Sequence, residues 1–331
     1  MSKKNQIGMV FLCTVIVSII SPFILRAIQY FIGDSFVIMV ANQLLLLSPS
    51  AVYIATNRVG IKKSIRIKKV TVSNVFLCII LAFLIMPIMN LINALSLLVS
   101  ENVIQQTITD VVGNSALFSS VFAIAIIPAL FEETIFRGVL YNEYRKKNVG
   151  VAILLSAFLF GIMHQNFNQF TYAFAMGIVF ALLIEATDSI ASTMIIHFVI
   201  NGSSVLLTYL TPKIMELMKE YGGNAVDYEQ LVDTTITREA IVASLGYYFV
   251  SATIATILAF LVFRTIANNT GRWNHVKAIF TKDKENLIVE NDETENIDRT
   301  GGIFSVPLVI GIVVSLLILI ANEIYIAVYG L

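Results

Sequence analysis

The chain has 331 residues, of which 57% are hydrophobic and only 13% are charged, and its formal net charge is zero. Soluble domains carry about one quarter of charged residues, so this composition excludes an ordinary soluble domain. The balanced charge also gives no reason to expect a nucleic-acid partner. We therefore expect an all-α protein that crosses a lipid bilayer several times.

Apolar segments of membrane-spanning length follow one another along the chain. They cover residues 7–25, 36–56, 74–99, 116–141, 150–164, 171–187, 190–210, 240–263 and 303–328. The fifth is short, which is expected of a helix that ends on a buried polar site. Lys3 and Lys4 precede the first segment, but no small-residue cleavage pattern follows it, so we expect a retained helix rather than a signal peptide. These segments predict a polytopic bundle of eight or nine membrane helices with a conical polar cavity inside it.

Basic residues gather in alternate connections between these segments. Arg58, Lys62, Lys63, Arg66, Lys68 and Lys69 follow the second segment, Arg145, Lys146 and Lys147 the fourth, and Arg264, Arg272, Lys277, Lys282 and Lys284 the eighth. The connections 100–115 and 165–170 contain neither Lys nor Arg. The positive-inside rule then predicts a cytoplasmic N-terminus and an external C-terminus, with the plasma membrane as the expected location. The connection 211–239 is of mixed sign, and the polar stretch 281–300 is expected to be mobile.

The chain divides into three expected parts. Residues 1–115 contain the first three helices, 116–210 contain helices four to seven, and 211–331 contain the last two helices with their polar connections. An internal repeat is not visible, which weakens the interpretation as an inverted-repeat transporter. Cys13 and Cys78 lie in apolar runs and are expected to be free thiols.

Three groups of polar residues lie inside the central apolar segments, where ionisable residues mark a functional site by default. They are Glu132, Glu133 and Arg137 in the fourth segment, His164 at the end of the fifth, and His197 with Asn201 in the seventh. Counted from the predicted cytoplasmic side, these residues lie at overlapping depths of about 12 to 21 Å along their helices. We therefore expect one site to which three helices contribute.

Helix geometry separates the roles of the two glutamates. Glu132 and Glu133 point about 100° apart around one helix, so they cannot face the same way. Arg137 follows Glu133 by four residues, which predicts an ion pair between them and leaves Glu132 available for chemistry. His197 and Asn201 share one helical face by the same spacing, and Phe160 is placed to flank His164.

Ordinary structural roles explain several other polar residues. A Glu–Arg pair can simply end a helix, and a lone intramembrane His or Asn can join two helices. We interpret Gln43, Asn90 and Asn93 as such interhelical contacts, Glu185, Asp188 and Glu323 as residues at helix ends, and His275 as a solvated loop residue. These roles do not explain why a carboxylate, two imidazoles and an amide meet at one depth.

Three short stretches carry a family resemblance: EETIFRG at 132–138, FGIMH at 160–164 and HFVIN at 197–201. They resemble the EExxxR, FxxxH and HxxxN motifs of the CAAX protease and bacteriocin-processing (CPBP) intramembrane proteases, which include the type II CAAX prenyl endopeptidases. The resemblance covers about residues 116–210. It implies that Glu132 and His164 activate water while His197 and Asn201 stabilise the transition state. Glu133, Arg137 and Phe160 are then expected to support them.

The expected function is that of an intramembrane endopeptidase that hydrolyses a hydrophobic or lipidated peptide. The alternative is a membrane scaffold or bacteriocin-immunity protein that binds a partner without cutting it. A secondary transporter is the third hypothesis, and it would require broken helices in matching halves, which the sequence does not show. The sequence leaves the natural substrate and the oligomeric state open.

The family is often labelled metalloprotease, so a metal also has to be considered. A catalytic zinc site needs three protein ligands and one open position, and His164, His197 and Glu132 would be those ligands. However, Glu132 and Glu133 diverge, Arg137 competes for Glu133, and the chain contains no HExxH motif. We therefore predict a glutamate-dependent hydrolase without a tightly bound metal, and we name zinc as the alternative cofactor.

Overall fold

The computed structural model describes residues 2–56, 61–221, 237–281 and 302–329. Arg58, Lys282 and Lys284 lie outside the described residues, as does nearly all of the stretch 281–300 that is expected to be mobile. Within the described ranges all regular secondary structure is helical. The connection 211–239 differs from expectation at its start, because the helix of the seventh segment continues to Glu220.

The helices follow the predicted segments closely. The first group is α1 (Lys3–Ile32), α2 (Ser35–Thr56), α3 (Ile61–Ser64), α4 (Val72–Ser96) and α5 (Val103–Asn114). A continuous helical stretch then consists of α6 (Leu117–Val121), the π-helical η1 (Phe122–Ile126), α7 (Ile127–Glu133), the π-helical η2 (Thr134–Tyr141) and α8 (Asn142–Tyr144). The remaining helices are α9 (Val149–Ile162), α10 (Phe167–Thr187), α11 (Ile190–Glu220), α13 (Arg238–Asn269), α14 (Trp273–Phe280) and α15 (Val306–Tyr329).

In the described part of the chain, eight helical stretches are long and apolar enough to cross a membrane, and α9 is a shorter apolar helix. This confirms the polytopic helical bundle and the short fifth segment. The conical cavity stays a prediction. Cys13 and Cys78 are free thiols, as expected.

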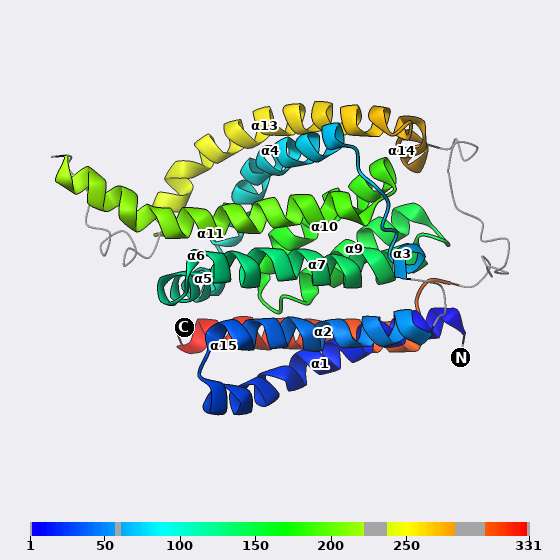
Figure 1. Cartoon of the computed structure of the whole chain (residues 1–331), viewed down its shortest axis with the longest axis horizontal. Coiled ribbons are helices and arrows are strands. Elements are labelled where there is room, and N and C mark those ends of the chain that lie inside the picture. Colours follow the sequence, from blue (N-terminus) through cyan, green and yellow to red (C-terminus); the bar gives the residue numbers. More distant parts are fainter. Residues whose placement is uncertain (1, 57–60, 222–236, 282–301, 330–331) are drawn as a thin grey trace.

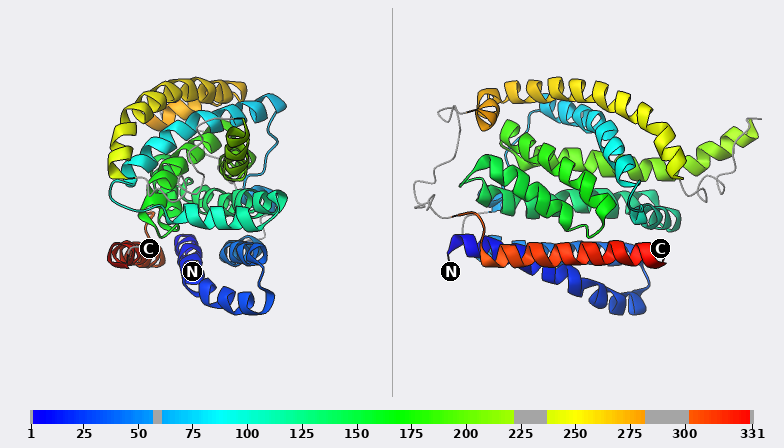
Figure 2. Two further views of the ribbon diagram at one scale, coloured as in Figure 1. Left: turned by 90° about the vertical axis from the view of Figure 1, so that its left-hand side faces the viewer. Right: turned by 180° about the vertical axis from the view of Figure 1, so that it is seen from behind.

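The helices lie in three layers (Figure 1). One outer layer consists of α15, α1 and α2, in which α1 contacts both of the others. The opposite outer layer consists of α4 and α13, which pack along each other. Between them lie α7, α9, α10 and α11, and the two views of Figure 2 show the same order. The helices of the predicted central part are therefore covered on both sides.

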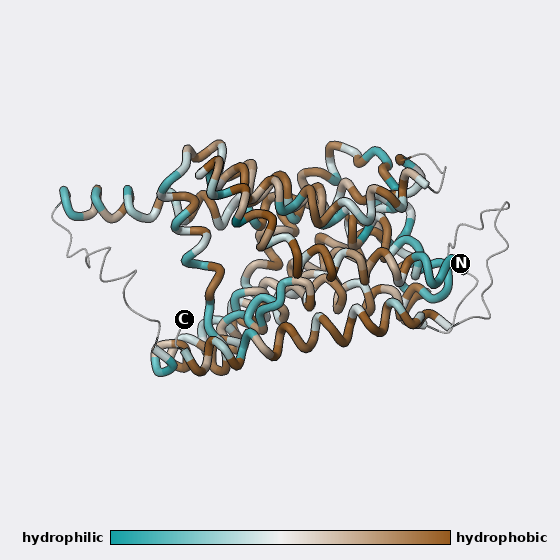
Figure 3. The backbone as a smooth tube through the Cα atoms, turned by 90° about the horizontal axis from the view of Figure 1, so that it is seen from below, coloured by the Kyte–Doolittle hydropathy of each residue, from teal (hydrophilic) through white to brown (hydrophobic). Residues whose placement is uncertain are grey.

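The two chain ends lie at opposite ends of the bundle (Figure 1). Short helices α3 and α14 lie at the N-terminal end, where Lys3 pairs with Glu143 and Lys147 donates to the carbonyl of Gly302. Figure 3 shows mostly hydrophobic residues along the middle of the helices and hydrophilic residues toward their ends. The basic connections thus gather at one end, and the assignment of that end to the cytoplasm stays a prediction.

A proline accounts for the irregular helix in the middle layer. Pro128 begins α7 directly after η1, and it has no N–H to donate to the carbonyl of Ile124, its partner in a regular α-helix. Loss of that hydrogen bond favours a wider turn, and π-helical turns are frequent at functional sites. The sequence predicts one regular helix here, and the structure shows a helix whose side-chain directions change at η1 and η2.

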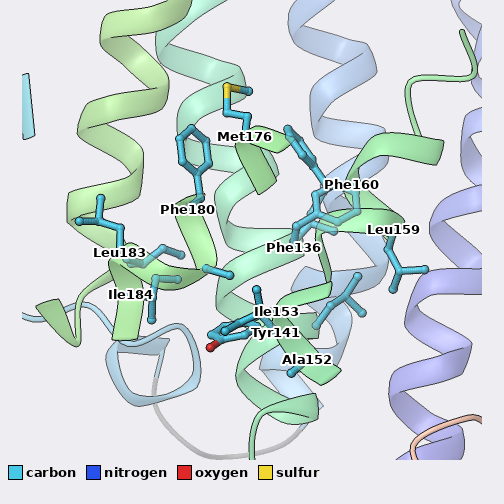
Figure 4. Packing of buried hydrophobic residues seen from close by; sticks show 14 of the residues in the cluster. Phe136, Tyr141, Ala152, Ile153, Leu159, Phe160, Met176, Phe180, Leu183 and Ile184 are labelled. Atoms are coloured by element: carbon cyan, nitrogen blue, oxygen red, sulfur yellow. The ribbon is translucent and has the colours of Figure 1, made fainter. Parts of the chain in front are cut away.

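A close approach between α9 and α10 sets the width of the middle layer. A Cβ atom placed on Gly177 would lie 2.7 Å from the Cα of Ala157 and 3.2 Å from Nη2 of Arg137. Only glycine fits at this crossing, which is typical of membrane helices that pack through small residues. The interior beside it is filled by large side chains, including Phe136, Phe160 and Phe180 (Figure 4).

Candidate active site

The predicted ion pair is present and lies entirely inside the protein. Arg137 Nη1 donates to Glu133 Oε1 at 3.1 Å, and both side chains are 0% exposed. Nδ1 of His197 lies 3.0 Å from the same oxygen, and this imidazole is also buried. A carboxylate paired with arginine can only accept hydrogen bonds, so Nδ1 of His197 is the donor. Glu133, Arg137 and His197 therefore form one buried unit on two helical stretches.

Aromatic rings hold the arginine in place. The guanidinium carbon of Arg137 lies 4.2 Å from the ring centroid of Phe160 and 5.1 Å from that of Phe180. Both rings also contact His197, with centroid distances of 6.2 and 5.6 Å. A desolvated cation gains about 2 kcal/mol from an aromatic face, which compensates part of the lost hydration. Figure 4 shows Phe160 and Phe180 within the same packed interior.

Glu132 lies at the edge of this buried unit. Its side chain is 19% exposed, whereas that of Glu133 is fully buried. One oxygen, Oε1, accepts a hydrogen bond from Nε2 of Gln43 at 3.0 Å, and Oε2 lies 3.9 Å from Nε2 of His197. The two glutamates thus have different surroundings, as their divergence around the helix predicts. Only Glu132 combines a partly exposed carboxylate with a position beside the buried histidine.

His164 joins the cluster through Phe160. Its Nδ1 lies 2.9 Å from the backbone carbonyl of Phe160, and the imidazole meets the phenyl ring edge-on at 5.0 Å between centroids. A carbonyl accepts only, so Nδ1 of His164 carries a proton. In the neutral ring Nε2 then has the lone pair, and this nitrogen can accept a proton. The side chain is partly exposed, unlike that of His197.

The turn after His164 is fixed by two outer helices. Gln165 adopts a left-handed backbone with φ of 55°, its side chain donates to Ser18 of α1, and its carbonyl accepts from Asn322 of α15. Glu323 accepts from the backbone N–H of Phe167 at 2.7 Å and so caps the start of α10. Glu323 thus lies near the end of α15, as expected, and has a structural contact that the sequence does not predict. It anchors the turn that presents His164.

Asn201 has a structural contact in addition to any chemical role. Its Nδ2 donates to the backbone carbonyl of Ile124 at 3.1 Å, which is the carbonyl that Pro128 cannot reach with an N–H. Asn201 is partly buried, and it lies one turn from His197 on α11. This bond connects α11 to η1. A role as oxyanion donor would have to use the second N–H of the amide.

The structure brings most of the predicted site residues together. Glu132, Glu133, Arg137, Phe160 and His197 form one contiguous cluster, His164 adjoins it, and Asn201 lies one turn away. Two members were not predicted as site residues, namely Gln43 and Phe180. Gln43 and Phe180 reach the site because of the way α2 and α10 are oriented toward α7 and η2. The spacing of residues in the sequence does not predict that orientation.

The donor set does not have the arrangement of a metal site. Among the described residues, no three His, Cys, Asp or Glu side chains are grouped so that they could hold a metal ion. Glu132 accepts from Gln43 through Oε1, and both histidines donate through Nδ1, so a metal would have to bind Oε2 of Glu132 and the two Nε2 atoms. Because His164, His197 and Glu132 are not grouped as ligands in the described part of the chain, they do not fit a zinc site as they stand, and we derive no step through a metal.

A second buried network lies nearer the basic end, and it corrects one sequence interpretation. Glu185 is fully buried and accepts from Nε and Nη2 of Arg145 at 2.7 and 2.8 Å, from the Tyr141 hydroxyl at 2.7 Å and from His275 at 2.6 Å. Burial lowers the pKa of Arg145, but the ion pair with Glu185 outweighs it and holds that pKa above its ordinary value. Glu185 lies at the end of α10, as expected, but it is buried in this network, and the interpretation of His275 as a solvated loop residue is wrong. Together they join η2, α10 and α14.

Asp188 also has a structural role beyond that of a helix-end residue. It ends α10 in a left-handed conformation with φ of 57°, and its carboxylate pairs with Arg66 and Lys68 from the segment that precedes α4. Asp188 therefore ties the end of α10 to that segment.

Comparison with known proteins agrees with the three motifs. Residues 114–203 match the family model described as Type II CAAX prenyl endopeptidase Rce1-like. The chain is similar to the membrane-embedded CAAX protease MroQ of Staphylococcus aureus (strain USA300), with 30% identity over 107 residues, which cover 30% of this chain and 43% of the relative. It is also similar to YdiL of Bacillus subtilis (strain 168), a proposed membrane peptidase, with 32% identity over 131 residues, which cover 38% of this chain and 52% of the relative.

The matched regions span about half the length of these curated relatives. No solved structure matches the chain significantly. The family match contains every residue of the candidate site except Gln43. The resemblance that the motifs predict is therefore confirmed over residues 114–203, which match the model of the Rce1-like type II CAAX prenyl endopeptidases.

Proposed function

We propose that this protein is an intramembrane endopeptidase in which Glu132 and His164 activate a water molecule. The observation that carries the proposal is the difference in burial within one cluster. Glu133, Arg137 and His197 are buried and bind one another through Glu133 Oε1, whereas Glu132 and His164 are partly exposed beside them. A hydrolase needs such a division, because the supporting charges must stay fixed while the reacting groups meet water and substrate.

The reaction can be written with these groups alone. A water oxygen attacks the carbonyl carbon of the scissile peptide bond while Glu132 or Nε2 of His164 accepts the water proton. The carbonyl oxygen then carries negative charge, which the second N–H of Asn201 can stabilise, a contribution often worth about 3 kcal/mol. The accepted proton passes to the departing amide nitrogen, the C–N bond breaks, and a carboxylic acid and an amine remain.

His197 supports this chemistry from behind Glu132. It donates through Nδ1 to Glu133, so its Nε2, 3.9 Å from Glu132 Oε2, points toward the reacting carboxylate. This distance is longer than a direct hydrogen bond and suits a bridging water. The resemblance implies transition-state stabilisation by His197, and its buried place between two glutamates supports a positioning role for the same ring.

The substrate class follows from where the cluster lies. The site is surrounded by helices that are apolar enough to cross a membrane, so a substrate has to reach it from or along the bilayer. We propose a hydrophobic or lipidated peptide. The relative MroQ is named a CAAX protease, which supports proteolysis in general and leaves the substrate of this chain to experiment.

The experiment uses purified protein in liposomes and a library of hydrophobic and lipidated peptides, with products identified by mass spectrometry. We expect the wild type to cleave at least one peptide and Glu132→Gln to cleave none. Glu143→Gln is the matched control, because it makes the same substitution in α8, where a carboxylate that is 14% exposed pairs with Lys146 and Lys3. Equal cleavage by wild type and Glu132→Gln would refute the proposal.

The scaffold hypothesis predicts a different result in cells. A strain that lacks the protein would be complemented with Glu132→Ala and His164→Ala variants at matched expression. Proteolysis predicts that neither variant rescues the strain. Rescue by both would show that binding without cleavage carries the biological role.

A further inference from the structure

Among the described residues, Gln43 contacts the candidate reacting carboxylate from outside the family segment. It lies on α2, far from residues 114–203 in sequence, and its Nε2 donates to Glu132 Oε1 at 3.0 Å. Helix α2 packs against both α7 and η2, the two stretches that carry the glutamates and the arginine. A residue of the outer layer therefore contacts the candidate active site directly.

The other end of the same amide has no partner in the described structure. Gln43 Oε1 is buried and makes no hydrogen bond to a described residue. A buried carbonyl oxygen without a donor costs about 1–3 kcal/mol, so it requires an explanation. Oε1 lies about 2 Å from Nε2 in a primary amide, so a water that bound Glu132 on this side would meet Oε1 as a second acceptor. The side chain thus holds the carboxylate with one atom and offers an acceptor beside it with the other.

We propose that Gln43 positions Glu132 for water activation and that Oε1 accepts one hydrogen bond from the attacking water. The water then has two acceptors, Gln43 Oε1 for one proton and Glu132 for the proton that is transferred. This fixes the lone pair of the water toward the substrate carbonyl carbon. The inference rests on the proposed peptidase function and assigns to α2 a part in its chemistry.

Asn42, the preceding residue, provides a matched comparison for a purely structural amide. It accepts a hydrogen bond from Ser21 Oγ of α1 at 2.9 Å, so it also joins α2 to another helix through one bond. That contact faces α1 and does not involve the cluster around Glu132. If Gln43 were only an interhelical contact, replacing either amide would have the same consequences.

The kinetic test compares Gln43→Met and Asn42→Leu, which both replace an amide by an apolar side chain of similar size. With a peptide cleaved by the wild type, we expect Gln43→Met to lower kcat by about 10- to 100-fold with KM nearly unchanged, because a misplaced general base affects the chemical step. Gln43→Glu keeps an acceptor but loses the donor, so we expect it to be at least as impaired. Asn42→Leu should keep the wild-type kcat. Equal kcat for Gln43→Met and Asn42→Leu would overturn the inference.

A second measurement needs no activity. Melting temperatures of Gln43→Met, Glu132→Met and the double variant form a double-mutant cycle, and a direct contact predicts that their effects are not additive. Additive effects would show that the two side chains do not interact and would overturn the inference. If the coupling is present but the wild type cleaves no peptide, the peptidase proposal fails, and the catalytic role of Gln43 fails with it while the contact stands.

Discussion

Two carboxylates that are adjacent in sequence have opposite surroundings in this structure. Glu133 is fully buried against Arg137 and His197, and Glu132 is partly exposed beside Gln43. The Glu133–Arg137 pair follows from helical spacing, so the sequence predicts it. The contact of Glu132 with Gln43 does not, because its partner lies on another helix and an isolated glutamine in an apolar segment has many equivalent interpretations.

Removal of the buried arginine tests the supporting role. Arg137→Ala leaves the Glu133 carboxylate without its cation in a site that is 0% exposed, so we expect a loss of stability on the order of 3 kcal/mol and loss of turnover. The measurement is the melting temperature in detergent together with peptide cleavage. Lys146→Ala is the control, since that cation is partly exposed in a short-range pair with Glu143. An Arg137→Ala variant with wild-type melting and turnover would contradict the pairing.

The metal content of the protein can be measured at the same site. Because the described His, Cys, Asp and Glu side chains form no group of three that could hold a metal ion, we expect no stoichiometric metal and no loss of cleavage after chelation. Elemental analysis of purified protein and activity with and without a chelator give both results. One zinc per chain, lost and regained together with activity, would instead make His164 and His197 ligands.

At the level of helices, the sequence predicts which residues are helical, but it does not predict where a helix departs from regular α-helical geometry. All nine apolar segments are helical, but several helices continue past the predicted ends, α1 to Ile32 and α11 to Glu220. The π-helical turns η1 and η2 are not predicted. A proline in the sequence indicates that one backbone hydrogen bond is lost, but it does not tell whether the helix widens into a π-helical turn or kinks. The same turn explains the contact of Asn201 with the carbonyl of Ile124, which spacing alone does not reveal.

The close crossing of α9 and α10 predicts that one added methyl group at Gly177 destabilises the protein. In Gly177→Ala the new Cβ would lie 2.7 Å from the Cα of Ala157, and since backbone has to move, we expect a loss of about 1–3 kcal/mol. Gly246→Ala in α13 is the control, because a Cβ there meets nothing within 4 Å. The melting temperatures of both variants decide the matter. An unchanged value for Gly177→Ala would show that the helices are farther apart than described.

At the scale of the whole molecule, the sequence predicts the helical class and the convergence of polar residues. It does not predict the three layers, because hydrophobic segments that face lipid and those that face other helices have the same composition. The sequence does not predict the second buried network, around Glu185, for a related reason. A carboxylate near a helix end can be solvated or buried, and only the packing of α14 against α10 distinguishes the two.

The direction of the bundle in the membrane is open to a direct test. The described basic connections lie at the end that carries the N-terminus, so we expect this end in the cytoplasm and the C-terminus outside. Single cysteines introduced at Lys3 and at Tyr329 in a variant without Cys13 and Cys78 can be labelled in intact cells with a membrane-impermeant reagent. Labelling at Tyr329 alone is expected. Labelling at Lys3 alone would reverse the orientation.

The central claim is that the Glu132 carboxylate performs chemistry, whereas the fold needs only an oxygen at this position that accepts from Gln43, which Glu132→Gln retains. The most direct measurement is the turnover of Glu132→Gln in liposomes, with its melting temperature and its affinity for the same peptide determined on one preparation. The account predicts that turnover falls by at least about a hundredfold while melting and peptide binding stay at wild-type values, because a general base contributes about that much. A folded Glu132→Gln variant that binds the peptide and cleaves it at the wild-type rate would contradict the account.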